Sequence, residues 1–174
     1  MELMDALRTR RSVRRYTNEP VADEQLQRLV EAAAWAPTGG NTQPWAFVIV
    51  RSRQNLSRLR ASAPGIIGAP TAVIAICLDR SRAGNEPGTS GYDCDVLGLG
   101  AAMQNLLLAA HAQGLGACAI ASFHIPSVRS ILALPQHLDP MLLIALGHAA
   151  GQPKPPRHRP MAEICFFESA GGTP

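Results

Sequence analysis

The segment Trp35–Trp45 reads Trp-Ala-Pro-Thr-Gly-Gly-Asn-Thr-Gln-Pro-Trp, and the rest of the chain can be interpreted around it. Pro37 ends any helix that precedes it, because its ring clashes with the previous turn and its nitrogen has no hydrogen to donate. Gly39 and Gly40 can adopt positive φ and let a ligand approach the backbone. The bulky residues 45–50 that follow are typical of a buried strand. The segment thus predicts a helix end, a polar glycine turn and a core strand, although a glycine turn alone is more often a plain connection than a ligand-binding loop.

Length and composition indicate one globular domain. The chain has 174 residues, of which 47% are hydrophobic and 17% charged, and this is enough for a single core. We therefore expect one domain over residues 1–174, with an extended arm from about residue 151, where a proline-rich run excludes a helix. No apolar stretch is long enough to span a bilayer, and residues 1–10 lack the apolar core of a signal peptide, so we expect a cytoplasmic protein without a membrane partner.

The distribution of cysteine, histidine and arginine narrows the class of protein further. The four cysteines and five histidines are scattered without metal-ligand or redox spacing, so we expect reduced thiols and no metal site. The net charge is only +3, but arginines cluster at 8–15 and 51–60. These clusters leave an arginine-rich nucleic-acid binder open as an alternative. No helix-turn-helix, zinc-finger or RNA-binding motif supports it, and we expect no nucleic-acid partner.

Hydrophobic periodicity predicts interleaved helices and strands. The expected helices are 2–10, 24–36, 55–63, 93–113 and 127–134, with Asp23 and Ser127 as the caps of the second and the last. The expected strands are 45–50, 71–78, 117–122 and 141–146, with a mobile loop at 82–91 and a last extended segment at 163–167. This order indicates an α/β or α+β fold with one sheet and helices packed on it. Helix 93–113 is apolar almost all round, so a second copy of the chain is the simplest partner to bury it.

Four further motifs accompany the glycine turn in register, one before it and three after it. They are Arg10-Arg11-Ser12-Val13-Arg14-Arg15-Tyr16, then Gln104-Asn105-Leu106-Leu107-Leu108 with Gly114-Leu115-Gly116-Ala117, then Leu146-Gly147-His148, and finally Pro156-Arg157-His158-Arg159-Pro160. In this order, and over about residues 4–166, the chain resembles the FMN-dependent nitroreductase superfamily. The resemblance implies an α+β fold with a single mixed, mainly antiparallel sheet flanked by helices, and a homodimer with a central buried helix.

The resemblance also implies which residues bind FMN. Arg10 and Ser12 would hold the phosphate, and Arg157 and Arg159 would close on it from the end of the chain, although both could instead belong to an ordinary solvated tail. Arg14 would face N1 and the C2 oxygen of the flavin, where reduction places negative charge. The glycine turn would reach the flavin of the other subunit, and the end of the third strand would pass its N5 edge. The full expected set is Arg10, Arg11, Ser12, Arg14, Pro37, Thr38, Gly39, Asn41, Gln43, Ala121, Ser122, Arg157 and Arg159.

By the same resemblance, the protein would be an enzyme in which NAD(P)H reduces FMN and a small acceptor, such as a nitroaromatic compound or a quinone, then takes the electrons by a ping-pong mechanism. No side chain is expected to be catalytic, because flavin N5 performs the hydride transfer. A non-catalytic flavin-binding or redox-sensing protein is one alternative, and another flavin reaction of the superfamily, such as flavin reduction or dehydrogenation, is a second. The chain departs from larger members in its short 82–91 loop and in Ala121, where some members have Glu, so the sequence leaves the acceptor open.

Overall fold

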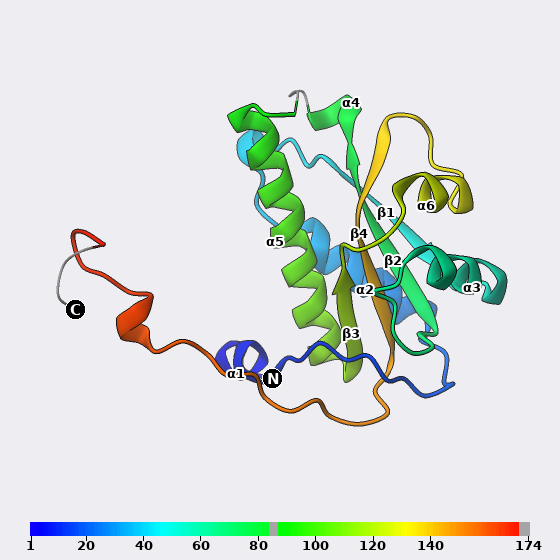
Figure 1. Cartoon of the computed structure of the whole chain (residues 1–174), viewed down its shortest axis with the longest axis horizontal. Coiled ribbons are helices and arrows are strands. Elements are labelled where there is room, and N and C mark those ends of the chain that lie inside the picture. The colour runs from blue at the N-terminus through cyan, green and yellow to red at the C-terminus, as the bar shows by residue number, and fades with distance from the viewer. Residues whose placement is uncertain (84–86, 171–174) are drawn as a thin grey trace.

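The fold is α+β, with one open sheet between two layers of helices (Figure 1). The computed structural model describes residues 1–83 and 87–170. The named strands follow the order β1-β2-β4-β3, and each neighbouring pair is antiparallel. Their bounds are β1 Trp45–Val50, β2 Ala72–Asp79, β3 Leu115–Ile120 and β4 Leu138–His148. The predicted single sheet is therefore confirmed.

Helices cover both faces of the sheet. Their bounds are α1 Leu3–Thr9, α2 Asp23–Ala34, α3 Arg53–Ser62, α4 Arg80–Ala83, α5 Ser90–Ala112 and α6 Ile125–Ile131, with short 3-10 turns η1 Gly39–Asn41 and η2 Met161–Glu163. One core cluster joins α2 and α5 to the sheet, and a second joins α3 and α6 to the opposite face. α5 is the long green helix at the side of the sheet in Figure 1.

The central strand β2 explains why its sequence is apolar without alternation. Residues 72–77 have no exposed surface, because each face of the strand lies under helices. Leu59 of α3 and Val128 of α6 are fully buried on one side, and Leu106 of α5 is fully buried on the other. A strand buried on both faces needs apolar residues at consecutive positions rather than at every second one.

The segment that follows α1 adds a short edge to the sheet beside β3. Ser12 forms a parallel bridge with Ala117, and the Val13 N–H donates to the Ala117 carbonyl at 3.0 Å. Tyr16 forms an antiparallel bridge with Ala149, just past the end of β4. The parallel bridge makes the sheet mixed at this edge, as predicted, although the four named strands are antiparallel.

Two glycines make room for this added edge. A Cβ atom on Gly116 would lie 2.6 Å from Val13 Cγ1, and one on Gly147 would lie 2.9 Å from Tyr16 Cδ1. Both distances are shorter than side chains tolerate, so any larger residue would push the segment off the sheet. The Tyr16 hydroxyl donates to the Val13 carbonyl at 2.6 Å, which fixes the segment from within. These contacts hold the residues 10–16 in place.

The predicted elements are largely confirmed, and the differences lie chiefly at the ends of helices and of the strands β3 and β4. Strand 45–50 has the predicted bounds, and the remaining strands and helices overlap their predicted ranges. Asp23 and Ser127 are not caps, because α2 already includes Asp23 and α6 begins after His124. Asp23 pairs instead with Arg51, and Ser127 Oγ lies 2.8 Å from His124 Nδ1. The partner of Asp23 is distant in the sequence, whereas that of Ser127 is the N-cap residue of α6 itself.

Two segments predicted to be irregular or extended also differ. Part of the predicted loop 82–91 is helical: Arg82 belongs to α4, and α5 begins at Ser90 behind the cap Thr89. Residues 84–86 of that loop lie outside the described residues. The predicted extended segment 163–167 forms no strand in the part of the chain that the structure describes, and its first residue, Glu163, belongs to η2. Ser12 and Val13 already pair with Ala117 on the outer side of β3, so the segment 163–167 does not add a strand at that position.

Residues 151–170 leave the body of the molecule as an arm. Figure 1 shows this arm passing beside α1 and then running away from the sheet. Its apolar side chains are exposed: Ile164 at 51%, Phe166 at 44% and Phe167 at 67%. An exposed apolar cluster of this kind is typical of a contact with another molecule.

We expect Gly116→Ala to destabilise the protein by about 1–3 kcal/mol, because the new methyl group overlaps Val13. Equilibrium denaturation by urea measures the change. Val13→Ala removes Cγ1, the nearest atom at 2.6 Å, but leaves Cβ at 2.9 Å, so the double variant should be only partly rescued and still more stable than the sum of the two single changes predicts. If the changes in the free energy of unfolding were strictly additive, the contact with Val13 would not be what restricts residue 116 to glycine.

Candidate functional site

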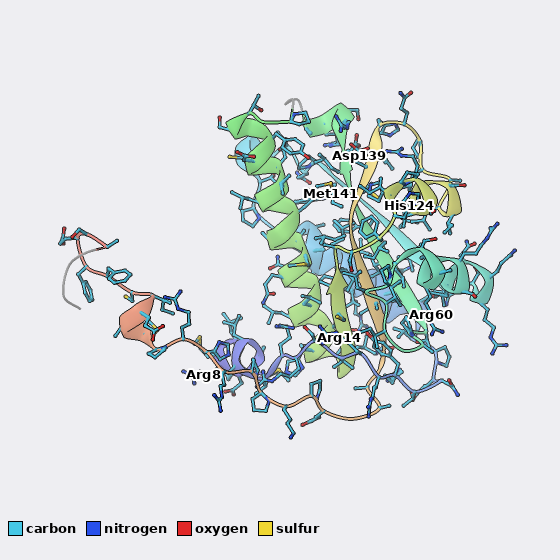
Figure 2. The ribbon with its side chains drawn as sticks, in the orientation of Figure 1. Arg8, Arg14, Arg60, His124, Asp139 and Met141 are labelled. Carbon is cyan, nitrogen blue, oxygen red and sulfur yellow. The ribbon has the colours of Figure 1, made fainter. Side chains whose placement is uncertain are left out.

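The predicted arginine motif lies on the added edge of the sheet. Arg10, Arg11 and Ser12 are half-buried, and Arg14 is exposed. Figure 2 shows Arg8 on α1 and Arg14 on the segment that follows it, beside the sheet. Because Val13 points at Gly116 and side chains alternate along an extended segment, Ser12 and Arg14 lie on the other side of it. The edge therefore presents a polar and basic side.

A pocket of about 550 Å³ opens between α1, the end of α5, this segment and the start of the arm. Arg10 and Arg11 line it together with His111, while Leu107 and Ala117 supply apolar wall. No Asp or Glu is among the described residues that line it. With two permanent cations and no described carboxylate, the pocket fits a phosphate or another anion.

His111 is a residue of this pocket that sequence reasoning missed. Its Nε2 lies 2.8 Å from the Thr9 hydroxyl, which joins the end of α5 to the end of α1. Partial burial, together with the positive charges of Arg10 and Arg11, lowers the pKa of His111 below its ordinary value. The only signal in the sequence is its place five residues before Gly116, and this spacing has no meaning without the fold.

The glycine turn has an unusual backbone. Three of four consecutive residues have positive φ: Gly40 at 58°, Asn41 at 55° and Gln43 at 48°. The side chain of Gln43 donates to Asn41 Oδ1 at 3.2 Å, and its backbone N–H donates to Thr38 Oγ1 at 3.1 Å. Positive φ is costly for residues with side chains, and such strain concentrates at functional sites.

The beginning of α5 holds this turn. Gly98 leaves room for Thr38, whose Cγ2 would lie 3.0 Å from an added Cβ, and Cys94 lies beside Gly39. The Thr42 hydroxyl donates to Asp95 at 3.5 Å, and Asp95 is buried. Predicted site residues Pro37, Thr38, Gly39, Asn41 and Gln43 therefore lie together, against one helix.

The turn and the arginine motif are not brought together within one chain. The turn contacts α5 near residues 94–98, whereas the pocket contacts α5 near 107–111. Thirteen residues of α-helix separate these positions and span roughly 20 Å. The two halves of the predicted site thus lie at opposite ends of α5.

Ala121 and Ser122 follow β3 and lie close to a loop that sequence reasoning missed. A Cβ on Gly65 would lie 2.6 Å from Ser122 Oγ, and a Cβ on Gly68 would lie 2.4 Å from the Arg14 carbonyl. Loop 65–68 therefore touches both the arginine segment and the end of β3. The signal for it in the sequence is the pair of glycines between Pro64 and Pro70.

Arg157 and Arg159 lie on the arm. Pro153 and Pro155 line the pocket, so Arg157 follows two residues beyond its wall. Arg159 instead donates to the Glu163 carboxylate at 3.2 Å and to the Glu163 carbonyl at 2.7 Å. Among the described residues, neither arginine forms a hydrogen bond with Ser12, so the arm and the arginine motif are not joined at the predicted phosphate site.

Residues 1–83 and 87–170 contain no group of three or more His, Cys, Asp or Glu side chains that could hold a metal ion. Within the same residues, no helix has the length and apolar character that crossing a membrane requires.

A family model and several known proteins match this chain in sequence. The model of the nitroreductase family matches residues 7–63 and 56–148. A Methanothermobacter thermautotrophicus protein provisionally named NADH dehydrogenase/NAD(P)H nitroreductase is 33% identical over 160 residues, which cover 88% of this chain and 80% of the relative. An FMN reductase (NAD(P)H) of Bacillus subtilis is 30% identical over 166 residues, which cover 86% of this chain and 66% of the relative.

A solved structure agrees with these relatives. A Desulfovibrio desulfuricans protein, provisionally named a nitroreductase and crystallised in complex with FMN, is 35% identical, with a TM-score of 0.81 and coverage of 95% of this chain and 96% of that one. Sequence, motifs and fold point to the same group, and the chain belongs to the nitroreductase family.

Proposed function

We propose that this protein is an FMN-dependent oxidoreductase that uses NAD(P)H to reduce a small molecule such as a nitroaromatic compound or a quinone. The observation that carries the proposal is the pocket beside α1, where Arg10 and Arg11 stand without a described carboxylate in a chain of the nitroreductase family. An FMN reductase and an FMN-bound structure among its relatives support the choice of cofactor. FMN, when bound, supplies hydride acceptance from NAD(P)H and electron donation to the second substrate.

The residues of one chain fit the phosphate and one edge of FMN. Arg10 and Ser12, with Arg11 beside them, would bind the phosphate, since guanidinium groups match phosphate geometry. Arg14 would lie near N1 and the C2 oxygen and stabilise negative charge there. Ala121 and Ser122, at the end of β3, would border the other edge; Ala121 offers backbone groups only. No described side chain needs to act as a general acid for hydride transfer.

A second copy of the chain would complete the site. The turn with Pro37, Thr38, Gly39, Asn41 and Gln43 lies roughly 20 Å from its own arginines along α5, so it would serve the flavin of a partner. Exposed apolar side chains near the turn and on α5 offer surface for such a partner: Trp35 is 80% and Leu97 72% exposed. We therefore propose a cytoplasmic homodimer with two composite FMN sites.

The arm would join the same assembly. Its apolar end has no described partner within the chain and would pack on the second subunit. Anchored in this way, Arg157 and Arg159 could turn toward the phosphate, and Arg159 would exchange its contact with Glu163 for one with FMN. An extended proline-rich run spans about 3.1 Å per residue, which gives the arm a defined reach.

The test of the function is anaerobic reduction of the purified, FMN-loaded protein. NADH or NADPH should bleach the flavin absorbance, and a nitroaromatic compound or a quinone should restore it. Flavin that binds tightly but is bleached by neither nucleotide would favour a flavin-binding or redox-sensing protein instead. A protein that binds no FMN would contradict the proposal.

We expect Leu97→Glu to convert the dimer to a monomer with much weaker FMN binding, because it places a charge on an exposed apolar position of α5. Light scattering gives the mass and flavin fluorescence the affinity. Ile125→Glu, a matching change at an exposed position of α6, should leave both unchanged. A Leu97→Glu monomer that keeps wild-type FMN affinity would refute the shared site.

We expect Arg14→Ala to lower the reduction potential of bound FMN, because a positive charge that stabilises the reduced flavin is removed. Since Arg14 is exposed in one chain, we expect the low end of a charge-assisted contact, about 1 kcal/mol, which is about 20 mV for a two-electron couple. Equilibration with a reference dye measures the potential. Arg15 is also exposed, and Arg15→Ala should cause no such shift. Equal potentials in the wild type and both variants would show that Arg14 does not lie near N1.

We expect Arg157→Ala combined with Arg159→Ala to weaken FMN binding by about 2–4 kcal/mol, because each side chain would contribute a charge-assisted contact to the phosphate. Fluorescence titration with FMN gives the affinity. Lys154→Ala removes another cation from the same arm and should have little effect. If the double variant binds FMN as tightly as the Lys154→Ala control, the phosphate site consists of Arg10 and its neighbours alone.

A further inference from the structure

The hydrogen bond between Thr9 and His111 determines which imidazole nitrogen carries a hydrogen, and the proposed function assigns no role to this pair. Thr9 Oγ1 donates to the Asp5 carbonyl at 2.5 Å, and the same oxygen lies 2.8 Å from His111 Nε2. A hydroxyl carries one proton, and Thr9 has already donated it, so its oxygen must accept from His111. Nε2 therefore carries the hydrogen, and Nδ1 is the nitrogen at which His111 can gain a proton.

The charges around His111 are set by the elements that meet at the pocket. The segment after α1 contributes Arg10 and Arg11, whose charges both act on His111. The start of the arm contributes only uncharged residues 151–153 and Pro155 to the described lining. Within the chain itself, burial and the two arginines disfavour a proton on His111.

A phosphate in the same pocket reverses this balance. It neutralises the field of Arg10 and Arg11 and places negative charge beside the imidazole, and a nearby opposite charge favours the protonated form. His111 remains only partly buried, so its proton can exchange with solvent without a change in the fold. The pocket thus contains two permanent cations, Arg10 and Arg11, and His111 becomes a third when it is protonated.

We propose that His111 is a phosphate-binding residue of the cofactor site, and that it takes up a proton at Nδ1 when the phosphate of FMN enters the pocket. This inference rests on the proposed FMN function and adds a residue to it. By linkage, His111 then strengthens FMN binding fully at a pH below its pKa in the free protein. The contribution is lost as the pH rises through its higher pKa in the complex.

The direct test follows the His111 imidazole by NMR over a pH titration, with and without saturating FMN. His111→Gln assigns the signal, and no substitution is needed in the protein under test. We expect the pKa of His111 to rise when FMN binds and to change little with riboflavin, which has the same ring and no phosphate. An unchanged pKa in an FMN-saturated protein would overturn the inference while leaving the proposed function intact.

Affinity gives a second, independent readout. Glutamine keeps an N–H that can donate to Thr9 but does not titrate, so His111→Gln removes the proton uptake alone. We expect FMN dissociation constants to rise about five- to tenfold in this variant at about pH 5.5 and less than about twofold at about pH 8.5, since one pKa unit corresponds to tenfold. The second ionisation of the FMN phosphate falls in the same range, but it affects both proteins equally.

Controls separate the possible failures. His137→Gln removes an exposed histidine that does not line the pocket and should behave as the wild type does. A ratio of dissociation constants that does not depend on pH would overturn the role of His111. So would a pH-dependent ratio that is the same for riboflavin. Absence of FMN binding by the wild-type protein would overturn both this inference and the proposed function.

Discussion

The backbone pairing of residues 12–16 with the edge of the sheet is the constraint on which the candidate site depends. One hydrogen bond from Val13 to Ala117, and the bridge of Tyr16 to Ala149, turn a solvent-exposed basic segment into an ordered edge. Gly116 and Gly147 permit it, because any side chain there would occupy the space of Val13 or Tyr16. Ser12 and Arg14 are thus placed chiefly by the backbone pairing of their segment.

Much of the fold was predictable, because its signals are local. The uniformly apolar run of β2, the proline and glycines around η1 and the glycine after α5 each specify backbone conformation within a few residues. The family was recognisable from motifs in register, and the match over residues 7–148 confirms it. The binding roles of the thirteen expected residues remain predictions, since grouping them in space requires contacts that periodicity does not encode.

What the sequence could not supply is long-range. His111 acquires its importance from Thr9 and Arg10, about a hundred residues away in the chain, and one isolated histidine has no signature. Loop 65–68 looks like an ordinary turn until Arg14 and Ser122 are found against it. The predicted cap at Asp23 was wrong for the same reason, because its side chain pairs with Arg51. The predicted cap at Ser127 was wrong for a local reason, because α6 begins earlier and Ser127 contacts His124 at the N-cap position.

The separation of the glycine turn from the arginine pocket along α5 has a genetic consequence. In the proposed dimer, a harmful change in the turn damages the site on the other subunit, whereas a change in the pocket damages the site on its own. A mixed dimer with one defect of each kind, carried on different subunits, would then concentrate both defects in a single site and leave the second one whole. Two inactive alleles of this gene could therefore complement each other within one cell.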